Sequence, residues 1–114
     1  MHELTIATSI LEHVESLAAL QPGECYAAIH LRIGDVSGIE PEALRFGLAL
    51  LARERGWPPL ELHCHTVPVS RRCRECGAHS EAIAASCSQC GGCALQFESG
   101  AELEIVSVDV EQAA

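Results

Sequence analysis

A doubled cysteine motif restricts what this chain can fold into more than any other feature of its sequence. Two Cys-x-x-Cys pairs lie only ten residues apart, and they are Cys73/Cys76 and Cys87/Cys90. Four thiolates close a tetrahedral shell around zinc most easily when each pair lies on a tight turn. Gly77 and Gly91 follow the two pairs, where the chain must turn back and glycine reaches positive φ at little cost. We therefore predict a structural zinc site formed by these four cysteines.

Disulfide bonds and a redox Cys-x-x-Cys are the alternatives to zinc. Seven cysteines in 114 residues would suit a secreted scaffold. However, the first twenty residues lack a basic start and are interrupted by Glu3, Glu12 and Glu15, so no signal peptide is predicted. No apolar run approaches the roughly 18 residues of a membrane helix. We expect a cytoplasmic protein with reduced thiols and no membrane association, and the odd number of cysteines also fits metal binding better than complete disulfide pairing.

The charge of the chain disfavours one common use of zinc ribbons. Seven basic residues against sixteen acidic ones give a formal net charge of -9. Four zinc-bound thiolates would make the chain more acidic still, and only Arg71, Arg72 and Arg74 gather near the cysteines. Nucleic acid would be repelled. An acidic chain that carries cysteine and histidine is more typical of a protein that handles cations or binds other proteins.

Hydrophobic periodicity predicts an α+β body around the cysteine segment. Apolar residues recur at helical spacing after Leu4, and they alternate along the strand that contains Ile29. Glu40-Pro41-Glu42 is typical of the start of a helix. The expected elements are helices over residues 4–20 and from 40–42 to 56, and strands over 25–33, 60–65 and 103–110.

These elements form two helices packed on a small three-stranded sheet, with a zinc-ribbon-like module inserted before the last strand. The strand at 103–110 needs a sheet to join, because a 29-residue insert with few apolar side chains buries little surface of its own. We predict an α+β domain of residues 1–70 plus 100–114 and a zinc-binding domain of residues 71–99. Metal binding with an apparent strength of about 10–16 kcal/mol would dominate the folding of the insert.

A second candidate metal site lies at Met1-His2-Glu3. The terminal amine, the first backbone amides and the His2 imidazole can close small chelate rings around one ion, and planar nitrogen ligands suit Ni²⁺ or Cu²⁺. The amides must lose protons to bind, so affinity would fall with pH and near the ordinary imidazole pKa of about 6.5. The alternative to metal binding is that His2 is an ordinary residue of a mobile chain end. The adjacent Glu3 and the helix that begins at once favour the chelate.

Four blocks of the sequence together resemble a known family. They are Met1-His2-Glu3-Leu4, the stretch RIGDVSGIEPE over residues 32–42, the two Cys-x-x-Cys pairs, and GAEL over 100–103 with VSVDVE over 106–111. In this order and at these spacings they are similar to the HypA/HybF family of nickel metallochaperones, over essentially the whole chain. Two differences from the family pattern are Ser88, where proline is usual, and a slightly short linker between the pairs.

The resemblance implies a nickel site and a set of partners. Nickel would be bound by His2 with neighbouring backbone nitrogens including that of Met1, with Glu3 close by and Glu40 as a further carboxylate. Zinc would be structural and Ni²⁺ the transferable cargo. The implied partners are a hydrogenase-maturation GTPase and the [NiFe]-hydrogenase large subunit, with urease as another route. The sequence does not distinguish a monomer from a homodimer.

Several residues keep two interpretations at this point. Cys93 could replace Cys90 as a zinc ligand, although the Gly91 turn favours Cys90. His63 and His65 form either a metal pair or ordinary exposed polarity on a strand, whereas Cys25 and Cys64 read as small buried groups. His79 lies inside the zinc loop and reads as solvated. His13 and His30 read as surface residues.

The sequence gives little support for enzyme chemistry, because no Ser/His/Asp set, glycine-rich phosphate loop or HExxH motif is found in it. A zinc ion coordinated by four thiolates also has no open position for water. We expect a protein that is not an enzyme. The rival to a nickel carrier is a zinc-ribbon adaptor that joins proteins without a nickel role.

Overall fold

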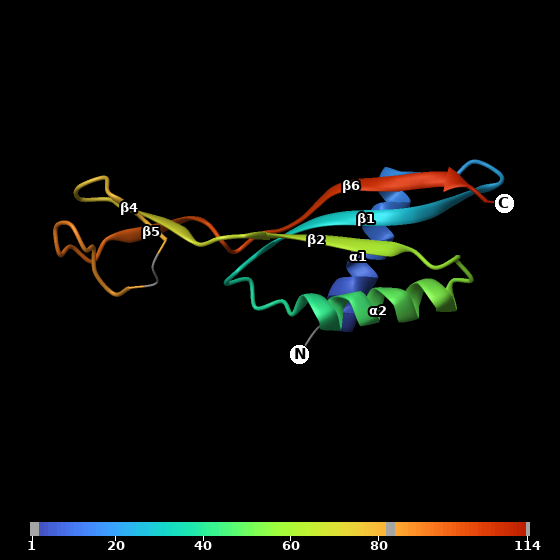
Figure 1. Ribbon diagram of the computed structural model, residues 1–114, viewed down its shortest axis with the longest axis horizontal. Coiled ribbons are helices and arrows are strands. Elements are labelled where there is room, and N and C mark those ends of the chain that lie inside the picture. Colours follow the sequence, from blue (N-terminus) through green and yellow to red (C-terminus); the bar gives the residue numbers. More distant parts are fainter. Residues whose placement is uncertain (1–2, 82–83, 114) are drawn as a thin grey trace. The chain divides into compact units, whose positions relative to one another are not determined.

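The computed structural model describes residues 3–81 and 84–113 of the chain. In chain order its elements are α1 (Glu3–Leu17), β1 (Glu24–Gly34), α2 (Pro41–Glu54), β2 (Glu61–Val67), β3 (Ser70–Cys73), β4 (His79–Ser80), β5 (Leu95–Ser99) and β6 (Leu103–Gln112) (Figure 1). The two helices and the three longer strands lie close to the ranges predicted from periodicity. Within the described residues, no helix has the length and apolar character needed to cross a membrane.

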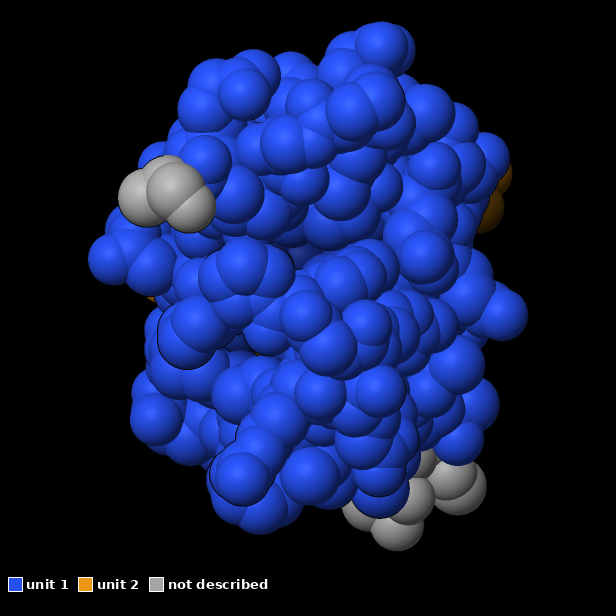
Figure 2. Space-filling model, turned by 90° about the vertical axis from the view of Figure 1, so that its right-hand side faces the viewer, with its two compact units in different colours: residues 1–32, 39–65, 104–114 blue, residues 33–38, 66–103 orange. Residues whose placement is uncertain are grey.

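The chain divides into two compact units, coloured separately in Figure 2. The first, here called the helix–sheet unit, contains residues 1–32, 39–65 and 104–114. The second, here called the cysteine unit, contains residues 33–38 and 66–103. These units are defined by contacts within the structure, whereas the domains predicted from the sequence were assigned by their proposed metal sites. The domain assignment therefore stays a prediction.

The helix–sheet unit is built on a three-stranded sheet of order β2-β1-β6. The last strand of the chain therefore joins the sheet of the two earlier strands, as predicted, and its neighbour in that sheet is β1. Alternate residues of β1 face opposite sides: Ile29 and Leu31 are fully buried, whereas Arg32 is exposed. The buried side chains of both helices complete the core of this unit, and they are Ala7, Ile10, Leu11, Val14, Leu44, Leu48 and Ala52.

Close packing between the two helices is centred on Gly47 of α2. A Cβ atom at this position would lie 3.4 Å from Leu4 Cδ2, 3.5 Å from Ala7 Cβ and 3.8 Å from the Glu3 carbonyl oxygen. These are ordinary van der Waals distances, so the first turn of α1 packs beside this position of α2 and a methyl group would also fit there. The start of α1 is held against the core rather than left as a free end.

The cysteine unit contains its own small sheet, of order β4-β3-β5, with both pairings antiparallel. Arg71 pairs with Ser80 on one side and with Phe97 on the other. These strands were not predicted, because Ser70-Arg71-Arg72-Cys73 carries no apolar alternation. Backbone pairing rather than hydrophobic periodicity makes them strands.

The turn after β1 packs within the cysteine unit. The Asp35 backbone N–H donates to the Val67 carbonyl at 2.9 Å, and the Val36 N–H donates to the Gly100 carbonyl at 2.7 Å. A Cβ at Gly34 would lie 2.1 Å from the Gly100 carbonyl carbon and oxygen, so only glycine allows this crossing of two chain segments. The Gly34-Asp35 turn is thereby tied to the segments that enter and leave the cysteine motif.

Candidate metal centre

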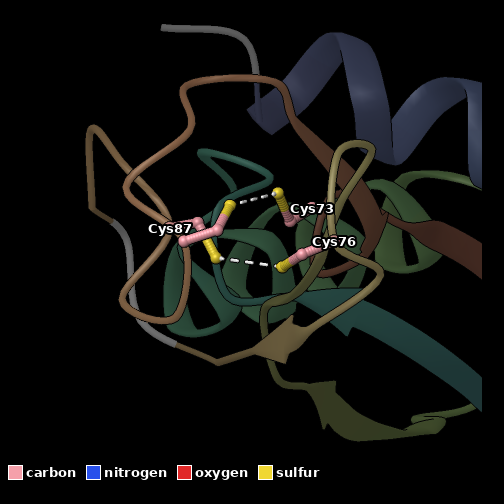
Figure 3. A group of neighbouring side chains, drawn as sticks. Cys73, Cys76 and Cys87 are labelled. Atoms are coloured by element: carbon pink, nitrogen blue, oxygen red, sulfur yellow. Dashed lines mark hydrogen bonds between the residues drawn. The ribbon is translucent and has the colours of Figure 1, made fainter.

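The four cysteines of the doubled motif converge, with their side chains pointing toward one another (Figure 3). Their four Sγ atoms lie within 4.8 Å of one another. Two of the sulfur pairs cross between the two motifs: Cys73 Sγ lies 3.6 Å from Cys90 Sγ, and Cys76 Sγ lies 3.6 Å from Cys87 Sγ. Residues far apart in sequence therefore form one compact sulfur cluster.

Each Cys-x-x-Cys is folded by the same backbone hydrogen bond. The Gly77 N–H donates to the Cys73 carbonyl at 2.9 Å, and the Gly91 N–H donates to the Cys87 carbonyl at 2.8 Å. Both glycines have positive φ, 79° and 75°, as the sequence pattern predicted. The repeated sequence is thus a repeated structure, and each copy places two sulfurs on the same side of a tight turn.

Backbone amides are aimed at the sulfur atoms. The Gln89 N–H lies 3.4 Å from Cys87 Sγ, and the Gly92 N–H lies 3.4 Å from Cys90 Sγ. Such donors stabilise a thiolate, the form that binds metal. Sequence reasoning did not identify these donors, since a backbone N–H carries no side-chain signature, although the repeated turn indicates where they must lie.

The hydrogen bonds make the sulfurs unequal as acids. The backbone N–H groups of Cys90 and Gln89 lower the pKa of Cys87 to about 7. The Gly92 N–H acts in the same direction on Cys90, but hydrogen bonds with the Cys73 and Cys76 side chains outweigh it and raise the pKa of Cys90 to about 12. The cluster therefore retains protons that a bound cation would displace.

The geometry and chemistry of this cluster fit zinc. Ligands about 2.3 Å from a tetrahedral zinc lie roughly 3.8 Å apart, close to the 3.6 Å of the two crossed sulfur pairs. A disulfide would bring two sulfurs to about 2.05 Å, and all seven cysteines are free thiols in this structure. Zinc ligation by Cys73, Cys76, Cys87 and Cys90 remains a prediction, with a donor set already in place.

Two other residues of the cysteine unit lie outside the cluster. Cys93 is exposed, and the structure gathers Cys90 rather than Cys93 with the other sulfurs. His79 Nδ1 lies 2.7 Å from Glu98 Oε1, so its imidazole is engaged by a carboxylate. The fit of the cluster to a metal therefore needs neither Cys93 nor His79.

The predicted nickel ligands belong to the other unit. Met1 and His2 lie outside the described residues, and Glu3 is the first residue of α1. Glu40 is exposed and occupies the N-cap position of α2 without a side-chain cap hydrogen bond, seven residues before Gly47, or about 10 Å along a helix that rises 1.5 Å per residue. Nickel binding by Met1, His2, Glu3 and Glu40 stays a prediction.

Comparison with known proteins gives one family. The family model described as hydrogenase/urease nickel incorporation metallochaperone, HypA, matches residues 1–110. The chain is 32% identical over 111 residues to the hydrogenase maturation factor HypA of a Synechococcus species, covering 96% of this chain and 99% of that protein. It is 34% identical over 113 residues to HypA of Chlorobaculum tepidum, covering 97% and 100%.

Solved structures show the same fold. The solution structure of the Ni metallochaperone HypA from Helicobacter pylori superposes with a TM-score of 0.63 at 19% identity, covering 100% of this chain and 99% of that one. A second HypA solution structure gives a TM-score of 0.69 at 17% identity, covering 96% and 95%. The α+β architecture described above is therefore shared with known structures.

Proposed function

Because the chain belongs to the HypA family of hydrogenase/urease nickel incorporation metallochaperones, we propose that it binds Ni(II) at its N-terminus and delivers it during maturation of [NiFe]-hydrogenase. The observation that carries this proposal is the family match over residues 1–110, which includes the Met1-His2-Glu3 start and both Cys-x-x-Cys pairs. A zinc ion held by the four cysteines has a structural role in this proposal. A protein of this kind transfers a cation by ligand exchange and is not an enzyme.

The start of α1 supports a nickel site at the chain end. The first four N–H groups of a helix have no partner within that helix, so the Glu3 amide is not needed to hold α1 together. Packing of Leu4 and Ala7 against Gly47 fixes the first turn beside α2. A chelate of the terminal amine, the first amides and the His2 imidazole would therefore have a rigid base, with Glu3 beside it.

Two sites with opposite properties suit such a carrier. A closed shell of four thiolates holds its ion and leaves no position for exchange. Nitrogen ligands at a chain end form few bonds with the rest of the fold, so a partner can replace them one at a time. We assign the exchangeable ion to the N-terminus for this reason, with residues 1–70 plus 100–114 as the nickel-binding domain and 71–99 as the zinc-binding domain.

The proposed recipients follow from the family description. We propose a hydrogenase-maturation GTPase and the [NiFe]-hydrogenase large subunit as partners, with urease as the second destination that the family description includes. We also propose that the protein works in the cytoplasm, where reducing conditions keep the cysteines available to zinc. A homodimer is compatible with these assignments.

Titration of Ni²⁺ into the zinc-loaded protein with a native N-terminus tests this function. We expect one nickel ion to bind at the N-terminus, and His2→Ala to abolish that binding without loss of zinc. A tag fused before Met1 should have the same effect, because it removes the terminal amine. His13→Ala is the matched control, since His13 is an exposed histidine of α1 away from the chain end. Equal nickel binding by wild type and His2→Ala would favour the zinc-ribbon adaptor instead.

A further inference from the structure

Three histidines that belong to neither the four-cysteine cluster nor the N-terminal motif gather on the outer face of the β2-β1-β6 sheet. His30 lies on β1, and His63 and His65 lie on β2. The ring centroids of His30 and His63 are 4.7 Å apart with planes at 11°, and those of His30 and His65 are 6.4 Å apart with planes at 13°. Two neighbouring strands therefore bring half of the six histidines of the chain into one group.

Two carboxylates orient these imidazoles. His30 Nε2 lies 3.0 Å from Asp109 Oδ2 of β6, and His63 Nε2 lies 3.1 Å from Glu61 Oε2 of β2. An ionised carboxylate only accepts hydrogen bonds, so each neutral imidazole places its proton on Nε2 and presents Nδ1 as a lone pair. A carboxylate behind a histidine in this way also makes the free nitrogen a stronger metal ligand.

The charges around the group favour a cation. The nearby Arg32 is paired with Glu104 at 3.5 Å, so its charge is offset. Asp109 and Glu61 add two further negative charges beside neutral rings. Cys64 lies between His63 and His65 in sequence, but alternation along β2 places it on the opposite face. There burial raises the pKa of its thiol, with smaller and opposing effects of Arg45 and Glu42 of α2. The donor set on the outer face is therefore nitrogen and oxygen, without a thiol.

We propose that His30, His63 and His65 form a binding site for a divalent transition-metal ion of the kind that prefers imidazole, such as Ni²⁺, Zn²⁺ or Cu²⁺. The Nδ1 atoms of His30 and His63 are the principal ligands, His65 supplies a third nitrogen, and Asp109 and Glu61 are positioning residues. This site is separate from the four cysteines and from His2, and it does not depend on the proposed function.

Binding requires a rotation of the rings. In a parallel stack the ring lone pairs lie in parallel planes and do not meet at one point. The χ2 torsion of histidine has a broad energy profile, and the exposed fractions of the His30 and His63 side chains, 26% and 45%, leave room for it. One ring must therefore turn about χ2 to direct its Nδ1 toward the cation, and this turn breaks the Nε2 hydrogen bond of that ring while the other imidazole keeps its carboxylate.

The test uses zinc-loaded His2→Ala protein, so that the proposed N-terminal site cannot compete. Paramagnetic Ni²⁺ is added to ¹⁵N-labelled protein, and amide broadening is followed along the chain. We expect broadening centred on His30 of β1 and on residues 63–65 of β2. The His30→Asn/His63→Asn/His65→Asn variant should lose it and bind Ni²⁺ at least about tenfold more weakly. Asp109→Asn should weaken binding less than the triple change.

A matched control separates this site from general surface affinity. His13→Asn removes an exposed histidine of the same unit and should leave the broadening unchanged. Amide spectra without Ni²⁺ establish that each variant is folded. Broadening confined to other residues, or an affinity of the triple variant within about twofold of its parent, would overturn the proposal and leave the group as stacked surface side chains. Neither result would affect nickel binding at His2, which is measured separately as the difference between wild type and His2→Ala.

Discussion

The two units of this chain differ in what stabilises the interior of each. The helix–sheet unit buries Ile29 and Leu31 of its sheet against helix residues such as Leu11 and Leu44, all with no exposed surface. Among the described residues of the cysteine unit, the buried apolar side chains are fewer, and they are Ile33, Val67, Val69, Cys73 and Cys87. Two of these five are members of the sulfur cluster. Apolar burial supports the first unit, whereas cross-linking by a cation would support the second.

The largest effect that distinguishes the units is removal of zinc. Chelation, or Cys73→Ser, should disorder residues 71–99, because metal binding of about 10–16 kcal/mol then no longer offsets the loss of chain entropy. The two helices should stay folded. Amide hydrogen exchange measures both parts in one experiment. Loss of protection in α1 and α2 together with the cysteine unit would contradict the division of stabilising forces proposed here.

The reverse experiment weakens the apolar core. Leu11→Ala should destabilise the helix–sheet unit by about 2–5 kcal/mol, since it deletes a fully buried side chain from α1. Zinc content should remain one ion per chain. Urea unfolding followed by helix signal, combined with metal analysis, checks both statements. Leu17→Ala, at a position of the same helix that is 63% exposed, should change stability by less than about 0.5 kcal/mol.

A smaller effect tests the turn geometry of the cysteine unit. Gly91→Ala should weaken zinc binding by about 1–2 kcal/mol, because φ is +75° and a side chain there is strained, although a Cβ has nothing within 4 Å. Gly91→Asn should recover part of this loss, since asparagine tolerates the left-handed region better. Competition with a chromogenic chelator gives the affinities. Equal affinity of all three proteins would show that the turn is not strained by a side chain.

The smallest expected effect is that of Cys93→Ser. Cys93 is exposed and lies outside the sulfur cluster, so zinc should remain at one ion per chain with unchanged affinity. Metal analysis and the same chelator competition measure this. Cys90→Ser is the informative partner, because it removes a member of the cluster. If Cys93→Ser loses zinc instead, the ligand set contains Cys93.

The sequence predicted the helix–sheet unit well because its signals are local and periodic. Proline at position 41 begins α2, and alternation through Ile29 and Leu31 marks β1. The return of the last strand to this sheet was also predicted, because only one sheet was available to it, whereas its place beside β1 was not. The strands β3 and β5 were missed because backbone pairing with neighbouring strands, and not an apolar pattern, defines them.

Contacts between residues that are far apart in the sequence were harder to predict than helices and strands. The Cys-x-x-Cys pairs predicted a cluster of four sulfurs, but not the crossed arrangement in which Cys73 Sγ lies 3.6 Å from Cys90 Sγ. His30 read as a surface residue because its neighbours His63 and His65 stand more than thirty positions later in the sequence. Only the lateral order of the strands brings the three together, and that order is a property of the whole sheet.

The sulfur cluster has an inner and an outer side. Cys73 and Cys87, the first members of the two pairs, are buried, whereas Cys76 and Cys90 are exposed. Peroxides or competing chelators that arrive through solvent therefore meet one sulfur of each pair before the other. Solvent access to the shell is therefore through Cys76 and Cys90, and the burial of Cys73 and Cys87 shields one sulfur of each pair.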